Sequence, residues 1–264
     1  MAQEGFVYEA NAYGALKEYN ISTGGIAGAS HDKPDLTVKR GKKTSGVELK
    51  ISPTAAGSLV LKYHKGKWDY GEYKSDIEKK FIRDMAEQNG LMKQMNKSGT
   101  AGAKWRGKIP HLQNDASGKK VLVPPKIDKQ KAYKADLKKF GADNEVHIDI
   151  PAKMICDYYI AKKCSYFNVG SHGFYTLNGK DELGLNATLK KNKLPEIPDF
   201  AQNAKAKIRV RCQYKGGGDY QFVVTMQFSG VKKSPYNIAP LSKGSKSNID
   251  KSALAKDNLL MAFS

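Results

Sequence analysis

Three charged side chains near the N-terminus have the types and the spacing of a centre that binds a metal ion. Asp35 follows Pro34, and Glu48 and Lys50 lie two positions apart further along the chain. Residues two apart in a strand share a face and lie about 7 Å from each other. Two carboxylates that converge on one point repel each other unless a cation lies between them, and such oxygen ligands favour Mg²⁺. A lysine beside the ion can orient a water and offset charge on a phosphate, so the pattern predicts phosphodiester hydrolysis.

The residues around these side chains predict a β-hairpin that would bring them together. Leu36 and Val38 alternate with polar residues, and so do Val47, Leu49 and Ile51. This is the period of half-buried strands. With the basic segment 40–46 as the turn, Asp35 meets Glu48 and Lys50 on the polar face. An ordinary surface hairpin that carries Asp, Glu and Lys is the alternative.

A glutamate upstream of the hairpin is a candidate for the same centre. Residues 5–19 have helical spacing, with Phe6, Tyr13 and Leu16 on one face, and Glu9 falls on that face. A carboxylate that faces a core is costly unless it is hydrogen-bonded, neutralised or bound to a metal. The alternative is a glutamate in the first helical turn, where it interacts favourably with the helix dipole.

Pro34-Asp35 followed by Glu48-Leu49-Lys50 resembles the signature of the PD-(D/E)XK nuclease superfamily, which includes restriction enzymes, Holliday-junction resolvases and phage exonucleases. Members often carry a glutamate on the helix before the sheet, and Glu9 matches it in position and order. The resemblance implies that Asp35, Glu48 and Glu9 bind Mg²⁺, which Mn²⁺ can replace, and that Lys50 positions the attacking water.

The chain departs from the superfamily pattern at one place. Many relatives carry a glutamine shortly after the lysine, and this sequence has none between Lys50 and Gln88. Ser58 is a candidate for an equivalent polar contact, and His31 is a candidate for a phosphate contact, although a loop histidine is usually only solvated. The subfamily, and with it the substrate, is therefore not fixed.

The order of the expected elements predicts the fold class and the domains. The helix, the hairpin, an apolar run at 59–63 as third strand and a helix at 74–97 follow the superfamily's order. We expect an α/β (α+β) protein with a restriction-endonuclease-like αβββαβ core and a mixed sheet, extended by a basic insertion and a C-terminal β-rich region. The expected domains are a nuclease core at 1–95, a basic insertion or linker at 96–145, the rest of the α/β domain with a cationic hairpin at 146–241, and a flexible tail at 242–264.

The net charge points to a polyanionic partner. The chain has 45 Lys and Arg against 26 Asp and Glu, a formal net charge of +19, which favours nucleic acid. Trp105 and Arg106 lie in the basic insertion, where they could stack on a base and bind a phosphate. The alternative is a solvated, partly flexible insertion.

A cationic hairpin is predicted near the C-terminus. Polar and apolar residues alternate over 205–215 and again over 221–227, on both sides of a glycine-rich turn. One polar face carries a row of like charges, which is unfavourable unless an anion screens it. A solvated edge strand that uses Lys and Arg to prevent aggregation is the alternative. The candidate DNA contacts are Lys205, Lys207, Arg209, Arg211 and Lys215.

The compartment follows from what the sequence lacks. No run approaches about 18 apolar residues and no signal-peptide pattern opens the chain, so no membrane is expected. The three cysteines lack the spacing of a disulfide framework or a zinc site, which fits the cytoplasm of a bacterial or phage-infected host cell. The sequence thus predicts an Mg²⁺-dependent deoxyribonuclease, an endonuclease compatible with a homodimer. The alternative is a non-catalytic DNA-binding protein that keeps the nuclease fold.

Overall fold

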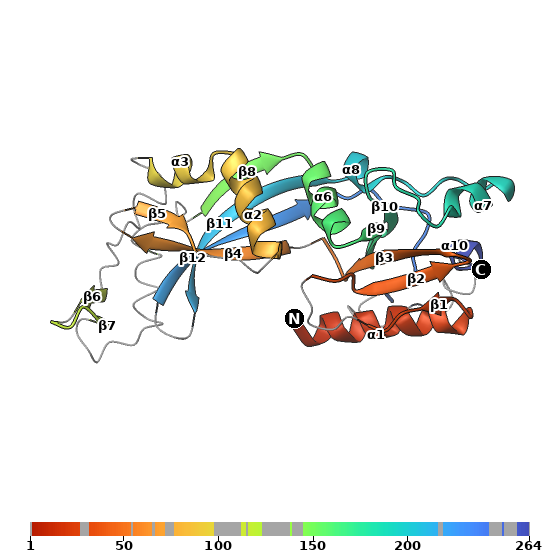
Figure 1. The fold of residues 1–264 in the computed structure, drawn as a ribbon, viewed down its shortest axis with the longest axis horizontal. Coiled ribbons are helices and arrows are strands. Elements are labelled where there is room, and N and C mark those ends of the chain that lie inside the picture. Colours follow the sequence, from red (N-terminus) through yellow and green to blue (C-terminus); the bar gives the residue numbers. More distant parts are fainter. Residues whose placement is uncertain are drawn as a thin grey trace. The chain divides into compact units, whose positions relative to one another are not determined.

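The protein combines helices and β-sheets in a mixed α+β architecture (Figure 1). The computed structural model describes residues 2–26, 32–53, 55–64, 67–71, 77–97, 112–114, 116–122, 138, 145–215, 219–242, 250 and 258–263. These residues form seven helices, two five-stranded sheets and a two-stranded sheet. The general α/β class predicted from the sequence is therefore confirmed.

The chain divides into two compact units. Unit one contains Met1–Ala56, Pro151–Ala206 and Gln227–Ser264, and unit two contains Gly57–Ile150 and Lys207–Met226. These bounds differ from the predicted division at residues 95, 145 and 241. In the sequence, the two segments of unit two interrupt unit one twice, after Ala56 and after Ala206.

The sheet of unit one is mixed, as predicted. Its strands lie in the order β1 (Ser22–Thr23), β2 (Leu36–Arg40), β3 (Lys43–Lys50), β9 (Cys164–Val169) and β10 (Gly173–Thr176). β3 pairs antiparallel with β2, with Leu36 opposite Val47, and parallel with β9, with Lys50 opposite Val169. All six residues of β9 are buried, as expected for a strand whose two faces are both covered.

Helices and aromatic side chains cover both faces of this sheet. On one face, α1 (Ala2–Glu18) contributes Tyr8, Ala12 and Leu16 to a core with Val47 and Leu49, which also includes α7 (Leu185–Lys191) and α10 (Asn258–Phe263). On the other face, the Phe167 ring lies 5.1 Å from Tyr159 of α6 (Lys153–Ala161) and 4.8 Å from Phe200 of α8 (Phe200–Asn203). The resulting helix–sheet–helix layers exclude water from both sides of β3 and β9.

The second sheet lies largely in unit two. Its strands follow the order β5 (Lys67–Tyr70), β4 (Ala55–His64), β12 (Asp219–Ser229), β11 (Lys205–Lys215) and β8 (Glu145–Ile150). Unit two also contains α2 (Ile77–Gln88), α3 (Leu91–Asn96) and the small pair β6 (Leu112–Asn114) and β7 (Lys120–Leu122). The Trp68 ring packs 4.7 Å from Phe222 in its core.

Three local expectations differ from the structure. The apolar run expected to be the third strand of the catalytic sheet belongs to β4 in the other sheet, and β9 takes the place beside β3. The expected turn at 40–46 is shorter, because Gly41 adopts a φ of 59° and lets β3 begin at Lys43. Phe6 is 48% exposed, since α1 turns Tyr8, Ala12, Ala15 and Leu16 inward instead.

Candidate active site

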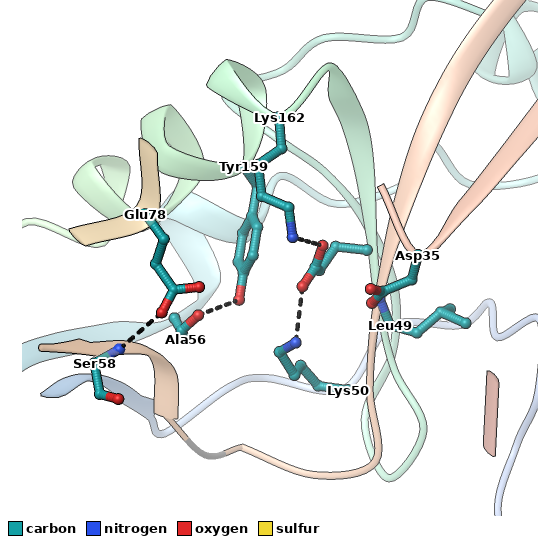
Figure 2. A network of polar contacts seen from close by, with 9 residues as sticks. Asp35, Leu49, Lys50, Ala56, Ser58, Glu78, Tyr159 and Lys162 are labelled. Carbon is teal, nitrogen blue, oxygen red and sulfur yellow. Dashed lines mark hydrogen bonds and ion pairs between the residues drawn. The ribbon is translucent and has the colours of Figure 1, made fainter. Parts of the chain in front are cut away.

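The β2–β3 hairpin brings Asp35 to the segment that carries Glu48 and Lys50, as the sequence predicted. Asp35 directly precedes β2 and is 8% exposed. Its Oδ2 accepts a hydrogen bond of 2.8 Å from the backbone amide of Leu49. Because Leu49 stands between Glu48 and Lys50 in the sequence, this bond holds the Asp35 carboxylate against the segment of β3 that carries both of them. Figure 2 shows Asp35 next to Leu49.

Glu48 lies at the centre of a buried ion-pair network. It is 2% exposed, its Oε1 accepts from Lys50 Nζ at 2.7 Å, and its Oε2 accepts from Lys162 Nζ at 2.8 Å (Figure 2). Lys162, 5% exposed, directly follows α6. A buried ammonium needs such a partner, since charges out of water are costly unless paired.

Two tyrosines of α6 surround the ammonium groups. Lys162 Nζ lies 5.8 Å from the ring centre of Tyr158 and 5.5 Å from that of Tyr159, and Lys50 Nζ lies 5.8 Å from Tyr159. The Tyr159 hydroxyl donates to the carbonyl of Ala56 at 3.3 Å, which fixes the ring. Aromatic faces attract cations, so the rings partly replace the lost hydration of both lysines.

The charges in this network shift one another's pKa values. Burial opposes ionisation of Glu48, but Lys50 and Lys162 outweigh it and lower its pKa. Burial, and then the neighbouring charge of Glu48, raise the pKa of Asp35 to about 7, even though both lysines act in the opposite direction. Burial also opposes the charge of Lys50, yet Glu48 and Asp35 raise its pKa. The site therefore contains one stabilised carboxylate and one that is close to protonation at neutral pH.

Glu9 belongs to the same electrostatic group. Burial raises the pKa of Glu9. The charge of Glu48 also raises it, whereas Lys50 and Lys162 act in the opposite direction. Its Oε2 is buried and has no hydrogen-bond partner among the described residues. Glu9 thus supplies a buried acceptor that no described residue satisfies.

Two structural residues of this site escaped the sequence argument. The first is Lys162, which only the parallel pairing of β3 with β9 brings to Glu48. The second is Gly46, where a Cβ would lie 2.5 Å from Pro34 Cγ and 2.7 Å from the carbonyl oxygen of Lys163. Only glycine lets Pro34-Asp35 and the end of α6 approach β3 together, and the Gly46 amide donates to Lys163 O at 3.1 Å. A glycine between alternating strand residues was the available signal.

A second buried network connects α1 to the C-terminal segment. The Asn168 side chain donates to Tyr8 Oη at 2.8 Å and accepts from the Ile238 amide at 3.1 Å. The Tyr8 hydroxyl donates to the carbonyl of Ala239 at 2.8 Å. Since Tyr8 precedes Glu9, these bonds fix the helix that carries Glu9 against β9.

The cationic strand is partly neutralised within unit two. Arg209 donates from both Nε, at 2.9 Å, and Nη2 to the carboxylate of Glu145, and Arg211 Nε lies 3.6 Å from the same group. Lys207 Nζ lies 3.5 Å from His147 Nδ1. Glu145 on β8 therefore provides some of the screening that the sequence argument assigned to a nucleic acid.

The remaining predicted residues are distributed as follows. Lys205, in unit one, is exposed. Ser58 lies on β4 of unit two, where its amide donates to Glu78 Oε1 at 3.2 Å (Figure 2). Trp105, Arg106 and His31, and the side chain of Lys215, lie outside the described residues.

Comparisons of the chain with family models, curated proteins and solved structures found no match. Among the residues that the structure describes, no three His, Cys, Asp or Glu side chains form a group that could hold a metal ion. No helix in the described ranges is long and apolar enough to cross a membrane.

Proposed function

We propose that this chain is a metal-dependent deoxyribonuclease that hydrolyses phosphodiester bonds within DNA. One observation carries the proposal: Asp35, Glu48, Glu9, Lys50 and Lys162 form one electrostatically coupled, largely buried group in unit one. Burying charges is costly to a fold, and strongly shifted pKa values cluster at functional sites.

A divalent cation would be held chiefly by two carboxylates, since the described residues contain no ready group of three ligands. Glu9 offers a buried carboxylate oxygen without a partner, and repulsion from Glu48 contributes to the raised pKa of Asp35. A cation held by Asp35 and Glu48, with Glu9 as a further ligand or through water, would relieve both effects. Mg²⁺ keeps several waters and needs only one or two carboxylates. When bound, Mg²⁺ or Mn²⁺ would polarise the phosphate and acidify a coordinated water.

The two lysines provide what the metal does not. Lys50 positions the attacking water, while its ammonium also offsets negative charge on the phosphate as the bond to the water forms. Lys162 keeps the Glu48 carboxylate ionised and oriented. Preorganised charges inside a site shielded from water stabilise a transition state more strongly than they would in bulk solvent.

The order of elements in unit one supports a PD-(D/E)XK assignment. A helix (α1), three strands (β1 to β3), a helix (α6) and a strand (β9) follow one another when unit two is left out. Asp35 then lies just before the start of β2, and the Glu-x-Lys pair lies on β3, the antiparallel neighbour of β2. The net charge of +19 favours DNA as the substrate.

A non-catalytic DNA-binding protein is the second candidate, and one observation favours it. Both oxygens of Glu48 already accept from lysines, so the carboxylate is neutralised without a metal. In that case the ion pairs would be structural and the protein would bind DNA without cleaving it.

Cleavage of covalently closed plasmid DNA separates the two candidates. We expect nicking or linearisation with Mg²⁺ or Mn²⁺ and none with EDTA, and a closed circle is cut only by an endonuclease. Lys50→Met should reduce cleavage about 100-fold or more while DNA binding persists. Lys180→Met, which removes an exposed lysine, is the control and should leave cleavage unchanged. A wild type that binds DNA but cleaves none of the plasmid, linear and branched substrates would favour the second candidate.

A further inference from the structure

A polar pocket of about 360 Å³ lies in unit one outside the group of buried carboxylates and lysines. Its size is at the lower end of the range for small-ligand pockets. The lining includes Ser171, His172, Lys233 and Ser234, and none of the lining residues that the structure describes is Asp or Glu. A pocket that contains a cation and no carboxylate favours an anion.

The side chains of this pocket have hydrogen-bond donors to spare. Ser171 Oγ and His172 Nδ1 lie 2.7 Å apart. If Ser171 donates, the imidazole proton is on Nε2 and remains available. If Nδ1 donates, the Ser171 hydroxyl proton remains available instead. Either tautomer therefore leaves one donor for a ligand.

Ser234 and Lys233 add further donors. Ser234 Oγ accepts from the Tyr236 amide at 3.2 Å, and its own hydroxyl proton is not used by that bond. Lys233 lines the pocket and is exposed, and its ammonium has three protons to donate. Burial and the charge of Lys233 lower the pKa of His172, because both disfavour the protonated imidazole.

The pocket adjoins the end of β3 that carries Lys50. The Gly170 amide donates to Lys50 O at 2.8 Å, and the Ser171 amide donates to Ile51 O at 3.0 Å. Hydrogen-bonded strands lie about 4.8 Å apart, so one wall of the pocket runs beside the backbone of Lys50.

The opposite wall is fixed to the same structure. The Asn237 side chain donates to Gly170 O at 2.8 Å, and the Ser234 amide donates to His172 O at 2.9 Å. Gly173, with a φ of 123°, permits this approach, because a Cβ there would lie 2.5 Å from Tyr236 O. These bonds hold the two walls of the pocket together, which reduces the entropic cost of binding.

We propose that this pocket binds a phosphate group of the DNA strand that is cleaved, close to the phosphate at which cleavage occurs. Lys233, Ser234 and the Ser171–His172 pair would donate hydrogen bonds to it. The proposed nuclease function is needed only to say that the bound phosphate belongs to the strand that is cleaved. It adds a subsite that fixes the register of the strand relative to Lys50.

Binding in EDTA, where no cleavage occurs, tests the subsite independently of catalysis. The affinity for a fluorescein-labelled duplex is measured at several salt concentrations for the wild type, Lys233→Ala and Lys233→Glu. The matched control is Lys232→Ala, which removes the neighbouring exposed lysine that does not line the pocket. Lys233→Ala should weaken binding about tenfold and reduce the salt slope by about 0.9, the value for one lost phosphate contact. Lys233→Glu should weaken it further.

A second arm identifies the source of the phosphate. Titration with inorganic phosphate should shift the imidazole NMR signals of His172 in the wild type and much less in Lys233→Ala. If Lys233→Ala binds DNA as tightly as the control Lys232→Ala, and with the same salt slope, the subsite is refuted. A response of His172 to inorganic phosphate combined with unchanged DNA affinity in Lys233→Ala would also overturn it, because the pocket would then serve a free anion. Weaker DNA binding by Lys233→Ala in a protein that never cleaves DNA would refute the nuclease and retain the subsite.

Discussion

Replacement of Asp35 by asparagine should stabilise the metal-free protein, and the effect should grow with pH. The Asp35 carboxyl has a pKa of about 7 in the fold against an ordinary value of 3.8. The folded state therefore holds a proton between these values that the unfolded state has lost, so wild-type stability falls as pH rises from about 4 to about 7. An asparagine has no such proton to lose, while its side-chain oxygen can still accept from the Leu49 amide.

The expected magnitude follows from the two pKa values. Each pKa unit corresponds to about 1.4 kcal/mol, so ionisation of Asp35 costs the fold at most about 4 kcal/mol above pH 7. Relaxation of the site and entry of water reduce this value, and we expect Asp35→Asn to gain about 2–4 kcal/mol at pH 8. At pH 4 the two proteins should be nearly equal in stability.

Urea unfolding in EDTA at pH 4, 6 and 8 measures the difference. Asp32→Asn is the matched control, because Asp32 is exposed and three positions away; it should change stability little at any pH. Addition of Mg²⁺ or Mn²⁺ at pH 8 should stabilise the wild type and leave Asp35→Asn unchanged. A destabilised Asp35→Asn, or a gain that does not depend on pH, would refute the account of the site as charges crowded by burial.

Three further substitutions test the site and the second sheet. Lys162→Met should destabilise the fold by about 3 kcal/mol in urea unfolding, because the buried Glu48 loses one of its two partners. Lys163→Met, at an exposed position, is the control and should not destabilise it. Equal effects of the two substitutions would contradict a specific ion pair between Lys162 and Glu48. Gly46→Ala should cost about 1–3 kcal/mol by overpacking and lower the affinity for Mn²⁺ in calorimetry, whereas Gly14→Ala, with open space around its Cβ, should be neutral or stabilising. Glu145 has a pKa lowered to about 2, mainly by its hydrogen bonds from Arg209, so its contribution is present above about pH 4.5 and is lost as pH falls towards 2. Glu145→Gln should therefore flatten the acid limb of the thermal unfolding profile, and an unchanged acid limb would show that this ion pair contributes nothing.

Local patterns explain what could be predicted of the site. The alternation around Glu48 and Lys50 has a period of two, which is set by strand geometry within a few residues. The pairing with Asp35 needed only a short turn. Glu9 was predictable as a polar residue among apolar ones, even though Phe6, chosen to define that helix face, is exposed. Helical spacing fits more than one face, and Tyr8, Ala12 and Leu16 outweigh Phe6 in the core.

Contacts between distant segments could not be predicted in this way. Lys162 meets Glu48 because β9 pairs parallel with β3, and no feature of segment 146–163 states which strand it will join. The apolar run in β4 was assigned to the sheet of β3 because it follows β3 in sequence, although its partners are β5 and β12. Neighbours in sequence are usually neighbours in a sheet, and the insertion of unit two breaks that rule here.

The division of unit one into three segments determines when the protein can fold during synthesis. A ribosome that adds about 5–20 residues per second needs roughly 5–20 s to proceed from β3 to β9. During that interval β3 has a free edge beside Val47 and Leu49, which is a site for wrong pairing with other chains. The Tyr8–Asn168–Ala239 network closes later still, once the third segment has emerged. The nascent chain therefore cannot assemble the coupled carboxylates and lysines until most of the protein has been made.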